Sequence, residues 1–275
     1  MSHFVASLGM YDHPAQQAAN DALWGWIAAR LAAQGVADVP ARLERERTPD
    51  QLWPDSHLLF GQACGFPYAR FHKQDLRIVA VPRYDAPHCE GTRHCSVIVA
   101  RDSDGRTELD DFRGAMAAIN DPVSNTGLNL LRHTVAEHCG SGAFFRGMVR
   151  TGSHIASMRA VAAGEAELAA IDAVTFAAAG ASYPGLTDGL KIIAVSRKVP
   201  ALPFVTARAT PEPVAALVQD ALLAAMQAPE LAEARAALFL LGAEPIAADA
   251  YDEVLELERA ADVAGVLRPE QPATA

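Results

Sequence analysis

The chain has 275 residues, of which 51% are hydrophobic, enough apolar material for one large domain or two lobes of moderate size. Lysine and arginine total 23 against 33 acidic residues, which gives a formal net charge of −10. This balance excludes a protein that covers nucleic acid, because no basic surface is available to neutralise phosphates. A small anionic ligand remains compatible with it, since backbone amides can hold an anion inside an acidic protein.

The first hundred residues contain four segments with the composition of strands, separated by a helix and by turns. The segment 4–10 runs into Asp12 and Pro14, which suit the N-cap and the first turn of a helix over 15–34. Three further strands are predicted at 57–61, 76–82 and 96–100.

The remaining chain continues this alternation and ends in helices. The predicted strands are 115–120, 147–150, 169–174 and 192–195. The predicted helices are 128–138, 154–163, 212–227, 230–241 and 248–266. The tail 268–275 carries two prolines and little to bury, so we expect it to be disordered.

Strands that alternate with helices predict an α/β protein with largely parallel sheets. Two extended segments, 96–101 and 192–197, are interpreted as places where the chain crosses between lobes. We therefore expect a discontinuous first lobe, made of 1–97 and 199–267, and an inserted second lobe, 98–198.

Two junctions between a strand and a helix are rich in small polar residues. The first reads Asn-Asp-Pro-Val-Ser-Asn-Thr-Gly over 120–127, and the second reads Thr-Gly-Ser-His over 151–154. Each taken alone is an ordinary set of helix N-caps. Both follow consecutive strands, however, and ligands of open α/β sheets bind at the carboxyl ends of strands. Free backbone N–H groups and the positive end of a helix dipole suit an anion there.

Longer motifs around these junctions resemble those of a known family. They are Glu-Leu-Asp-Asp-Phe-Arg-Gly at 108–114, Ala-Ile-Asn-Asp-Pro-Val-Ser-Asn-Thr-Gly at 118–127, Thr-Gly-Ser-His at 151–154, Ala-Ile-Asp at 170–172, Ser-Val-Ile-Val at 96–99 and Val-Pro-x-x-Pro-Phe at 199–204. Over roughly residues 4–210 the chain resembles the phosphate/phosphite/phosphonate-binding family of periplasmic solute-binding proteins of ABC transporters. The resemblance implies the two-lobed type II periplasmic-binding-protein fold, in which each lobe is a mainly parallel sheet flanked by helices and two hinge crossings join the lobes.

The resemblance also implies a set of ligand-binding residues, which are Tyr11, Tyr68, Ser124, Asn125, Thr126, Ser153, His154 and Asp172. Asn125 departs from the family, where a second hydroxyl is common at this place. Asp172 resembles an acidic residue that accepts a proton from the bound anion, and a structural cap is an equally good interpretation of it. An ionised carboxylate only accepts hydrogen bonds, so Asp172 in contact with the ligand would favour a protonated phosphorus oxyanion over sulfate.

The function implied by the resemblance is binding without catalysis. The chain would clamp a phosphonate, phosphite or phosphate-like oxyanion between its lobes and deliver it to an ABC-type permease. We expect no cofactor, no metal and no nucleic-acid partner, and we expect a monomer. Three alternatives stay open. The ligand is a small organic solute such as a heterocycle or a sulfonate, or the chain is a cytoplasmic sensor, or it is a cytoplasmic enzyme that uses Cys64, His154 or Asp172.

The first ten residues contain no basic segment and no apolar run of signal-peptide length. We therefore expect a periplasmic protein if a leader has been removed and a cytoplasmic one otherwise.

A cluster of potential metal ligands lies between the third and fourth predicted strands. It consists of His88, Cys89, Glu90, His94 and Cys95, and its spacing matches no common zinc pattern. Cys89 and Cys95 are interpreted either as a disulfide in an oxidising compartment or as reduced thiols.

Overall fold

The computed structural model describes residues 4–138 and 143–266, and these divide into two compact units. Unit 1 comprises 4–85, 90–93 and 200–251, and unit 2 comprises 86–89, 94–199 and 252–266. The tail 268–275, for which we predicted disorder, lies outside the described residues, and so does Cys139.

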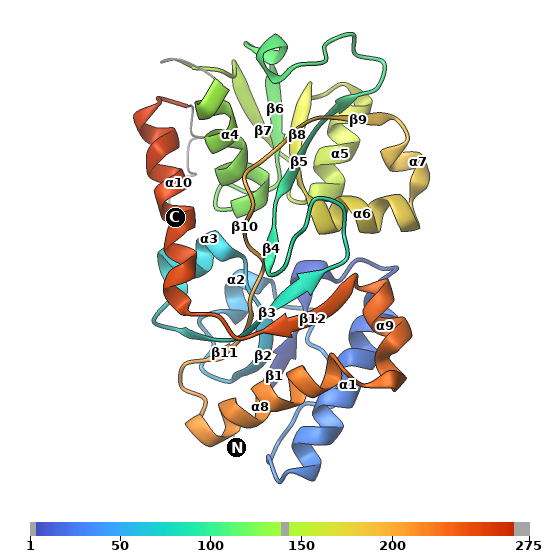
Figure 1. The fold of residues 1–275 in the computed structure, drawn as a ribbon, viewed down its shortest axis with the longest axis vertical. Helices are drawn as coiled ribbons and strands as arrows, with labels where there is room; N and C mark the ends of the chain where they lie inside the picture. The colour runs from blue at the N-terminus through green and yellow to red at the C-terminus, as the bar shows by residue number, and fades with distance from the viewer. Residues whose placement is uncertain (1–3, 139–142, 267–275) are drawn as a thin grey trace. The chain divides into compact units, whose positions relative to one another are not determined.

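Unit 1 is built on a five-stranded sheet in the spatial order β1-β2-β11-β3-β12. Its strands are β1 (Val5–Ser7), β2 (Leu58–Gln62), β3 (Leu76–Tyr84), β11 (Phe204–Ala207) and β12 (Leu240–Glu244). Its helices are α1 (Gln17–Ala33), α2 (Pro49–Leu52), α3 (Gly65–Pro67), α8 (Glu212–Ala225) and α9 (Ala232–Ala237), with short turns η1 (Gly9–Tyr11), η2 (Tyr68–His72), η5 (Pro229–Leu231) and η6 (Ala248–Tyr251). Helices α8 and α9 both contact α1, and α8 also contacts the sheet (Figure 1).

An aromatic stack forms the centre of unit 1. The Trp24 ring of α1 lies parallel to Phe60 of β2 at 5.6 Å between centroids, and Phe60 stacks in turn on Phe204 of β11 at 5.4 Å. These rings bury large apolar areas and hold the first helix onto two strands that are far apart in the sequence.

Unit 2 is built on a second five-stranded sheet, in the order β7-β6-β8-β5-β9. Its strands are β5 (Ser96–Arg101), β6 (Met116–Ile119), β7 (Gly147–Arg150), β8 (Leu168–Asp172) and β9 (Leu190–Val195). A separate two-stranded ribbon pairs β4 (Arg93–His94) with β10 (Val199–Pro200). The helices are α4 (Leu130–His138), α5 (His154–Ala163), α6 (Ala173–Ser182), α7 (Pro184–Thr187) and α10 (Asp252–Val263), with turns η3 (Leu109–Phe112) and η4 (Asn125–Asn129).

Both faces of the sheet in unit 2 are buried. Alternate residues of β6 point to opposite faces, as strand geometry requires. Ile119 belongs to a core that includes Leu131 of α4, whereas Ala118 belongs to a core that includes Met158 and Val161 of α5. The sheet of unit 2 is therefore the middle layer between two sets of helices (Figure 1).

The α/β class is confirmed, but the sheets are mixed where we expected them to be mainly parallel. In unit 1 only β1 and β2 pair in parallel, while β11 pairs antiparallel with both β2 and β3, and β12 pairs antiparallel with β3. In unit 2, β6 pairs in parallel with β7 and β8, and β5 is antiparallel to β8 and β9. The strand by which the chain enters unit 2, β5, and the strand by which it returns to unit 1, β11, each run antiparallel to the strands beside them.

The chain also passes between the units at a place that we did not expect. Besides the passages at 85–94 and 199–200, it returns to unit 2 after Tyr251. Helix α10 therefore belongs to unit 2, whereas we expected it in the first lobe, as part of the segment 199–267. Arg132 of α4 donates to Asp262 at 2.6 Å and to the carbonyl of Val266 at 3.0 Å. The Asn129 amide donates to the carbonyl of Val254 at 2.9 Å. These side chains from η4 and α4 fasten α10 to unit 2.

Two elements differ locally from the prediction. The predicted helix 230–241 is the short α9, and the strand β12 follows it. Phe239 has a φ of 56°, which a helix cannot contain, so the chain turns there. The predicted strand 169–174 ends at Asp172, where α6 begins.

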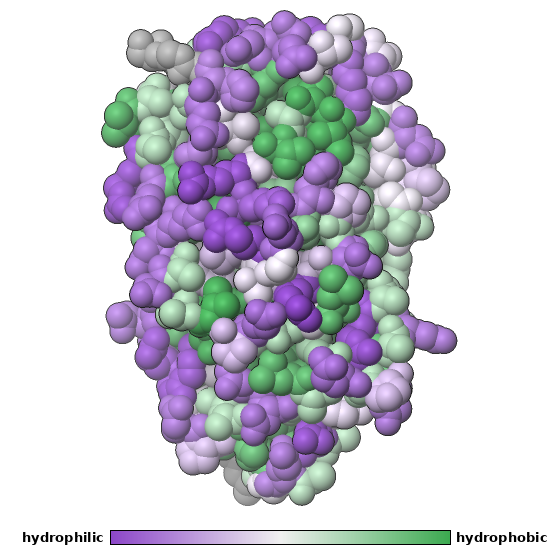
Figure 2. All heavy atoms as spheres, in the orientation of Figure 1, coloured by the Kyte–Doolittle hydropathy of each residue, from purple (hydrophilic) through white to green (hydrophobic). Residues whose placement is uncertain are grey.

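Large hydrophobic side chains on the surface are dispersed over both units. On the face drawn in Figure 2, hydrophobic areas are separated by hydrophilic side chains. The exposed large hydrophobic residues are Phe71, Val149, Tyr183, Ile192, Val195, Leu241 and Val263. Among the described residues, no helix has both the length and the apolar composition needed to cross a membrane.

Candidate functional site

Three helix starts lie at one edge of the sheet in unit 2. The strands β7, β6 and β8 are neighbours and run in parallel, so their carboxyl ends lie at the same edge. β6 leads to η4, which continues into α4; β7 leads to α5; and β8 leads directly into α6. Each start presents backbone N–H groups that lack partners within the helix, together with the positive end of its dipole. The edge is therefore suited to an anion.

The first helix start is capped by Ser124. Its Oγ accepts a hydrogen bond from the backbone N–H of Gly127 at 3.0 Å, which leaves the hydroxyl proton of Ser124 available to another acceptor. Asn125 and Thr126 follow in the first turn and are buried. The Ser96 hydroxyl of β5 donates to the carbonyl of Thr126 at 2.6 Å and fixes this turn to the sheet.

The second helix start is connected to the first by a side-chain contact. Ser153 caps α5, since its Oγ accepts from the backbone N–H of Ala156 at 3.1 Å. The next residue, His154, places Nε2 at 3.1 Å from Oγ1 of Thr126. The predicted grouping of the two junctions is thus present within unit 2.

The third helix start is capped by Asp172, which is 2% exposed. Its Oδ1 accepts from the backbone N–H of Thr175 at 3.0 Å, and its Oδ2 lies 3.0 Å from Nδ1 of His94. Burial by itself raises the pKa of the Asp172 carboxyl, but the hydrogen bond and charge of His94, the charge of His154 and the Thr175 N–H outweigh it. The pKa of Asp172 therefore lies below its ordinary value, and the group is ionised near neutral pH.

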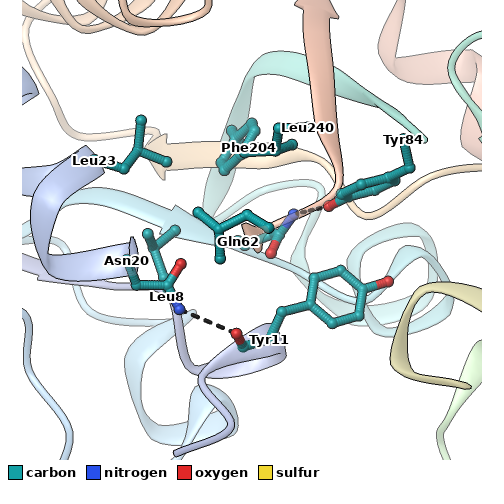
Figure 3. A pocket seen from close by; sticks show the side chains of 9 residues that line it. Leu8, Tyr11, Asn20, Leu23, Gln62, Tyr84, Phe204 and Leu240 are labelled. Atoms are coloured by element: carbon teal, nitrogen blue, oxygen red, sulfur yellow. Dashed lines mark hydrogen bonds between the residues drawn. The ribbon is translucent and has the colours of Figure 1, made fainter. Parts of the chain in front are cut away.

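The two predicted tyrosines belong to unit 1, where each contacts another tyrosine. Tyr11 follows β1, and its ring meets Tyr84 edge-on at 5.7 Å between centroids. Its carbonyl accepts from the Asn20 amide at 3.0 Å, as Figure 3 shows. Tyr68 follows β2, is 1% exposed and meets Tyr251 at 5.3 Å. The role of both tyrosines as ligand contacts stays a prediction.

A small cavity in unit 1 lies beside Tyr11, at the ends of β1 and β2 (Figure 3). Its volume is about 20 Å³, which is room for about one water molecule and too little for an organic solute. Gln62 crosses it and donates to the Tyr84 hydroxyl at 2.9 Å and to the carbonyl of Leu202 at 3.1 Å. The sequence alone did not lead us to Gln62 or Tyr84. Gln62 could have been found, because it is a polar residue at the end of a buried strand.

The residues that we considered as metal ligands form no metal-binding group within the described part of the chain. Within residues 4–138 and 143–266, no three His, Cys, Asp or Glu side chains are arranged to hold a metal ion. Cys64, Cys89 and Cys95 are not joined in disulfide bonds. Burial, with a smaller effect from the charge of Asp172, raises the pKa of Cys89 to about 12 and that of Cys95 to about 11. Both groups are therefore protonated and weakly nucleophilic near neutral pH.

His94 is the residue of this region whose importance the sequence did not show. We considered it only as a potential metal ligand, whereas it is fully buried against Asp172. The signal that would have found it is the pairing of β5 with β8, in which Ser96 lies opposite Asp172. That register places His94, two residues earlier, near the same carboxylate.

Two α/β units in one chain, with polar helix starts gathered at the edge of a sheet, are the features of a solute-binding protein that holds a small ligand. A family model described as "ABC transporter, phosphonate, periplasmic substrate-binding protein" matches residues 57–251. The chain belongs to this family, and it is a solute-binding protein of ABC-type uptake. Both the family and the two-lobed fold class predicted from the sequence are confirmed.

Solved structures agree with this fold at low sequence identity. A binding protein component of an ABC phosphonate transporter from Pseudomonas aeruginosa is 15% identical, with a TM-score of 0.74 over 96% of this chain and 88% of its own. PhnD1 from Prochlorococcus marinus, in complex with methylphosphonate, is 13% identical, with a TM-score of 0.74 over 94% and 97%. A protein from Xanthomonas citri bound to chloride is 14% identical, with a TM-score of 0.71 over 96% and 99%. A search of curated proteins by sequence finds no significant match.

Proposed function

We propose that unit 2 binds a small oxyanion, a phosphonate, phosphite or phosphate, at the starts of η4, α5 and α6, and that the chain passes it unchanged to an ABC permease. The observation that supports this most is the contact between Thr126 and His154, at 3.1 Å, because it joins two helix starts that follow neighbouring parallel strands. A tetrahedral anion needs several donors from different directions, and adjacent helix starts supply them.

Each proposed ligand residue has a chemical role. Ser124 uses its oxygen as an acceptor within the cap, so its hydroxyl proton is left for the anion. Thr126 and His154 share one hydrogen bond, and a ligand oxygen replaces part of that contact. Asn125 contributes its amide, and Ser153 brings the free N–H groups of the α5 start. Charge-assisted hydrogen bonds of this kind are the strong ones in proteins.

The comparisons support the choice of ligand. PhnD1 from Prochlorococcus marinus was solved with methylphosphonate and the Xanthomonas citri protein with chloride, so two proteins of similar fold hold anions. The family comprises periplasmic substrate-binding proteins, which supports an exported location for this chain. The closing of the two lobes over the ligand and the monomeric state stay predictions.

Two substitutions in the first helix start test the proposal. Ser124→Ala and Thr126→Val each remove one hydrogen bond to the anion, which costs about 1.5–3 kcal/mol of binding free energy. Isothermal titration calorimetry with methylphosphonate and inorganic phosphate measures the loss. Ser182→Ala, at the exposed end of α6, is the matched control and is expected to bind normally.

The ligand class is tested by thermal unfolding of the unsubstituted chain. An oxyanion at a hundredfold excess over its dissociation constant should add about 2.7 kcal/mol of stability. If a heterocycle or a sulfonate raises the melting temperature and none of the phosphorus oxyanions does, the proposed ligand class is wrong.

A further inference from the structure

Two consecutive hydrogen bonds connect the first helix start of unit 2 to helix α10. The side-chain Nδ2 of Asn129, the last residue of η4, donates to Oδ1 of Asn125 at 3.0 Å and to the backbone carbonyl of Val254 in α10 at 2.9 Å. Asn129 is 4% exposed and Asn125 is fully buried, so bulk water does not compete for these bonds. Both protons of the Asn129 NH2 group are therefore used inside the protein.

The carbonyl of Val254 fixes the orientation of both side-chain amides. A backbone carbonyl only accepts, so the group of Asn129 that faces it is the NH2 and not the oxygen. The same NH2 reaches Asn125, which means that the Asn125 atom on that side is its oxygen. Turning either amide around would place two buried acceptors face to face, which is costly. The NH2 group of Asn125 therefore lies on the side away from Asn129.

The geometry of η4 brings these two asparagines together. The backbone N–H of Asn129 donates to the carbonyl of Ser124, five residues earlier, at 3.0 Å, so η4 is a π-helical turn and wider than an α-helix. Such turns are rare and are frequent at functional sites. Asn125 lies in this turn between Ser124 and Thr126, which are proposed above to hold the anion. Its amide thus belongs to the segment that binds the ligand.

Resting on the anion site proposed above, we propose that Asn129 is a positioning residue for that site: anchored on the backbone of α10, it turns the NH2 group of Asn125 toward the bound anion. The oxygen of Asn125 is engaged by Asn129, so Asn125 offers the ligand a donor and no acceptor. The partner that matches such a donor is a negatively charged oxygen of a phosphonate or phosphate. Asn129 acts through Asn125 and needs no contact with the ligand.

A double-mutant cycle tests this, with titration calorimetry of methylphosphonate at pH 7 on the unsubstituted chain, Asn129→Leu, Asn125→Ala and the double variant. Asn129→Leu keeps the size of the side chain but frees the Asn125 amide to turn, and it should weaken binding by about tenfold. In the Asn125→Ala background the same change should alter the dissociation constant by less than about threefold, because no amide is left to position. A merely structural role of Asn129 would lower affinity equally in both backgrounds.

Two further measurements sharpen the test. Asp262→Ala is the matched control, because it removes the contact of Arg132 with α10 at 2.6 Å and leaves the asparagines in place; its affinity should stay within about twofold of the unsubstituted chain. In the unsubstituted chain, methylphosphonate should shift the NMR signals of the Asn125 side-chain NH2 group. Should Asn129→Leu not fold, Asn129→Ser takes its place in the cycle, since its shorter side chain cannot reach both partners.

The outcomes separate this inference from the proposed function. If methylphosphonate, phosphite and phosphate all fail to bind the unsubstituted chain, the proposed function fails and the inference with it. If methylphosphonate binds but Asn129→Leu binds it equally well, or loses affinity to the same extent with and without Asn125, the inference is overturned while the anion site stands. An unshifted Asn125 NH2 signal, or an equal loss of affinity in Asp262→Ala, overturns it in the same way.

Discussion

The substitution Gly127→Ala tests how tightly the first helix start is built. A Cβ at this position would lie 1.7 Å from Oδ1 and 2.6 Å from Cγ of Asn120, the residue that directly follows β6. It would also lie 3.1 Å from Oγ of Ser124, which now accepts from the Gly127 N–H. Contacts below 3.0 Å are not tolerated, so the Asn120 side chain must rotate away and the cap must shift.

The magnitude follows from two costs. Forcing extra volume into a closely packed site costs about 1–3 kcal/mol, and losing a serine N-cap costs about 1 kcal/mol. We therefore expect Gly127→Ala to lower the free energy of unfolding by about 2–4 kcal/mol. Anion affinity should fall as well, since the N–H groups and the Ser124 hydroxyl of this turn move together.

Urea unfolding and calorimetry with methylphosphonate measure the two effects. Gly185→Ala, in α7 of the same unit, is the matched control, because a Cβ there meets nothing within 4 Å. Combining Gly127→Ala with Asn120→Ala removes the obstructing side chain and should recover most of the lost stability. A Gly127→Ala variant as stable and as tightly binding as the unsubstituted chain would refute this account of the helix start.

Two further predictions concern ionisation in unit 2. The pKa values of Cys89 and Cys95 are raised to about 12 and about 11, so iodoacetamide at pH 8 should modify both thiols more slowly in the folded chain than in urea. Peptide mapping by mass spectrometry measures the two rates, and equal rates would contradict the prediction. The pKa of Asp172 is lowered by folding, so its contribution to stability is present above the ordinary aspartate pKa of about 3.9 and is lost as the pH falls through the folded value. Urea unfolding between pH 5 and pH 2 should thus show a shallower acid loss for Asp172→Asn, and identical slopes would contradict the prediction.

The sequence predicted those parts of the site that are encoded locally. Ser124 and Ser153 were recognised as cap residues from their neighbours alone, and both cap helices in the structure. Their convergence followed from the rule that parallel strands end at one edge. The His94 contact with Asp172 was not predictable in this way, because it depends on the pairing of β5 with β8.

The fold shows the same division between local and distant information. Alternating apolar segments identified most strands and the α/β class, but they do not specify whether a strand runs parallel or antiparallel to its neighbours. Whether β11 enters the sheet of unit 1 parallel or antiparallel depends on where the chain returns from unit 2. The position of α10 likewise depends on the buried Arg132 of α4, whose partners lie at the other end of the chain. A helix pattern by itself does not specify the unit that it covers.

A motif of helix caps predicts only part of the chemistry of the ligand. A run of caps at neighbouring helix starts encodes affinity for an anion, because N–H groups and dipoles come with the motif itself. It does not encode the protonation state that the anion must have, since that depends on whether a nearby carboxylate is compensated. In this chain the side chain that lies against the Asp172 carboxylate, His94, is on a strand outside the motif. Two chains with the same helix-start motif and the same aspartate can therefore differ in the anion that they prefer, because the surroundings of that aspartate are set by segments outside the motif.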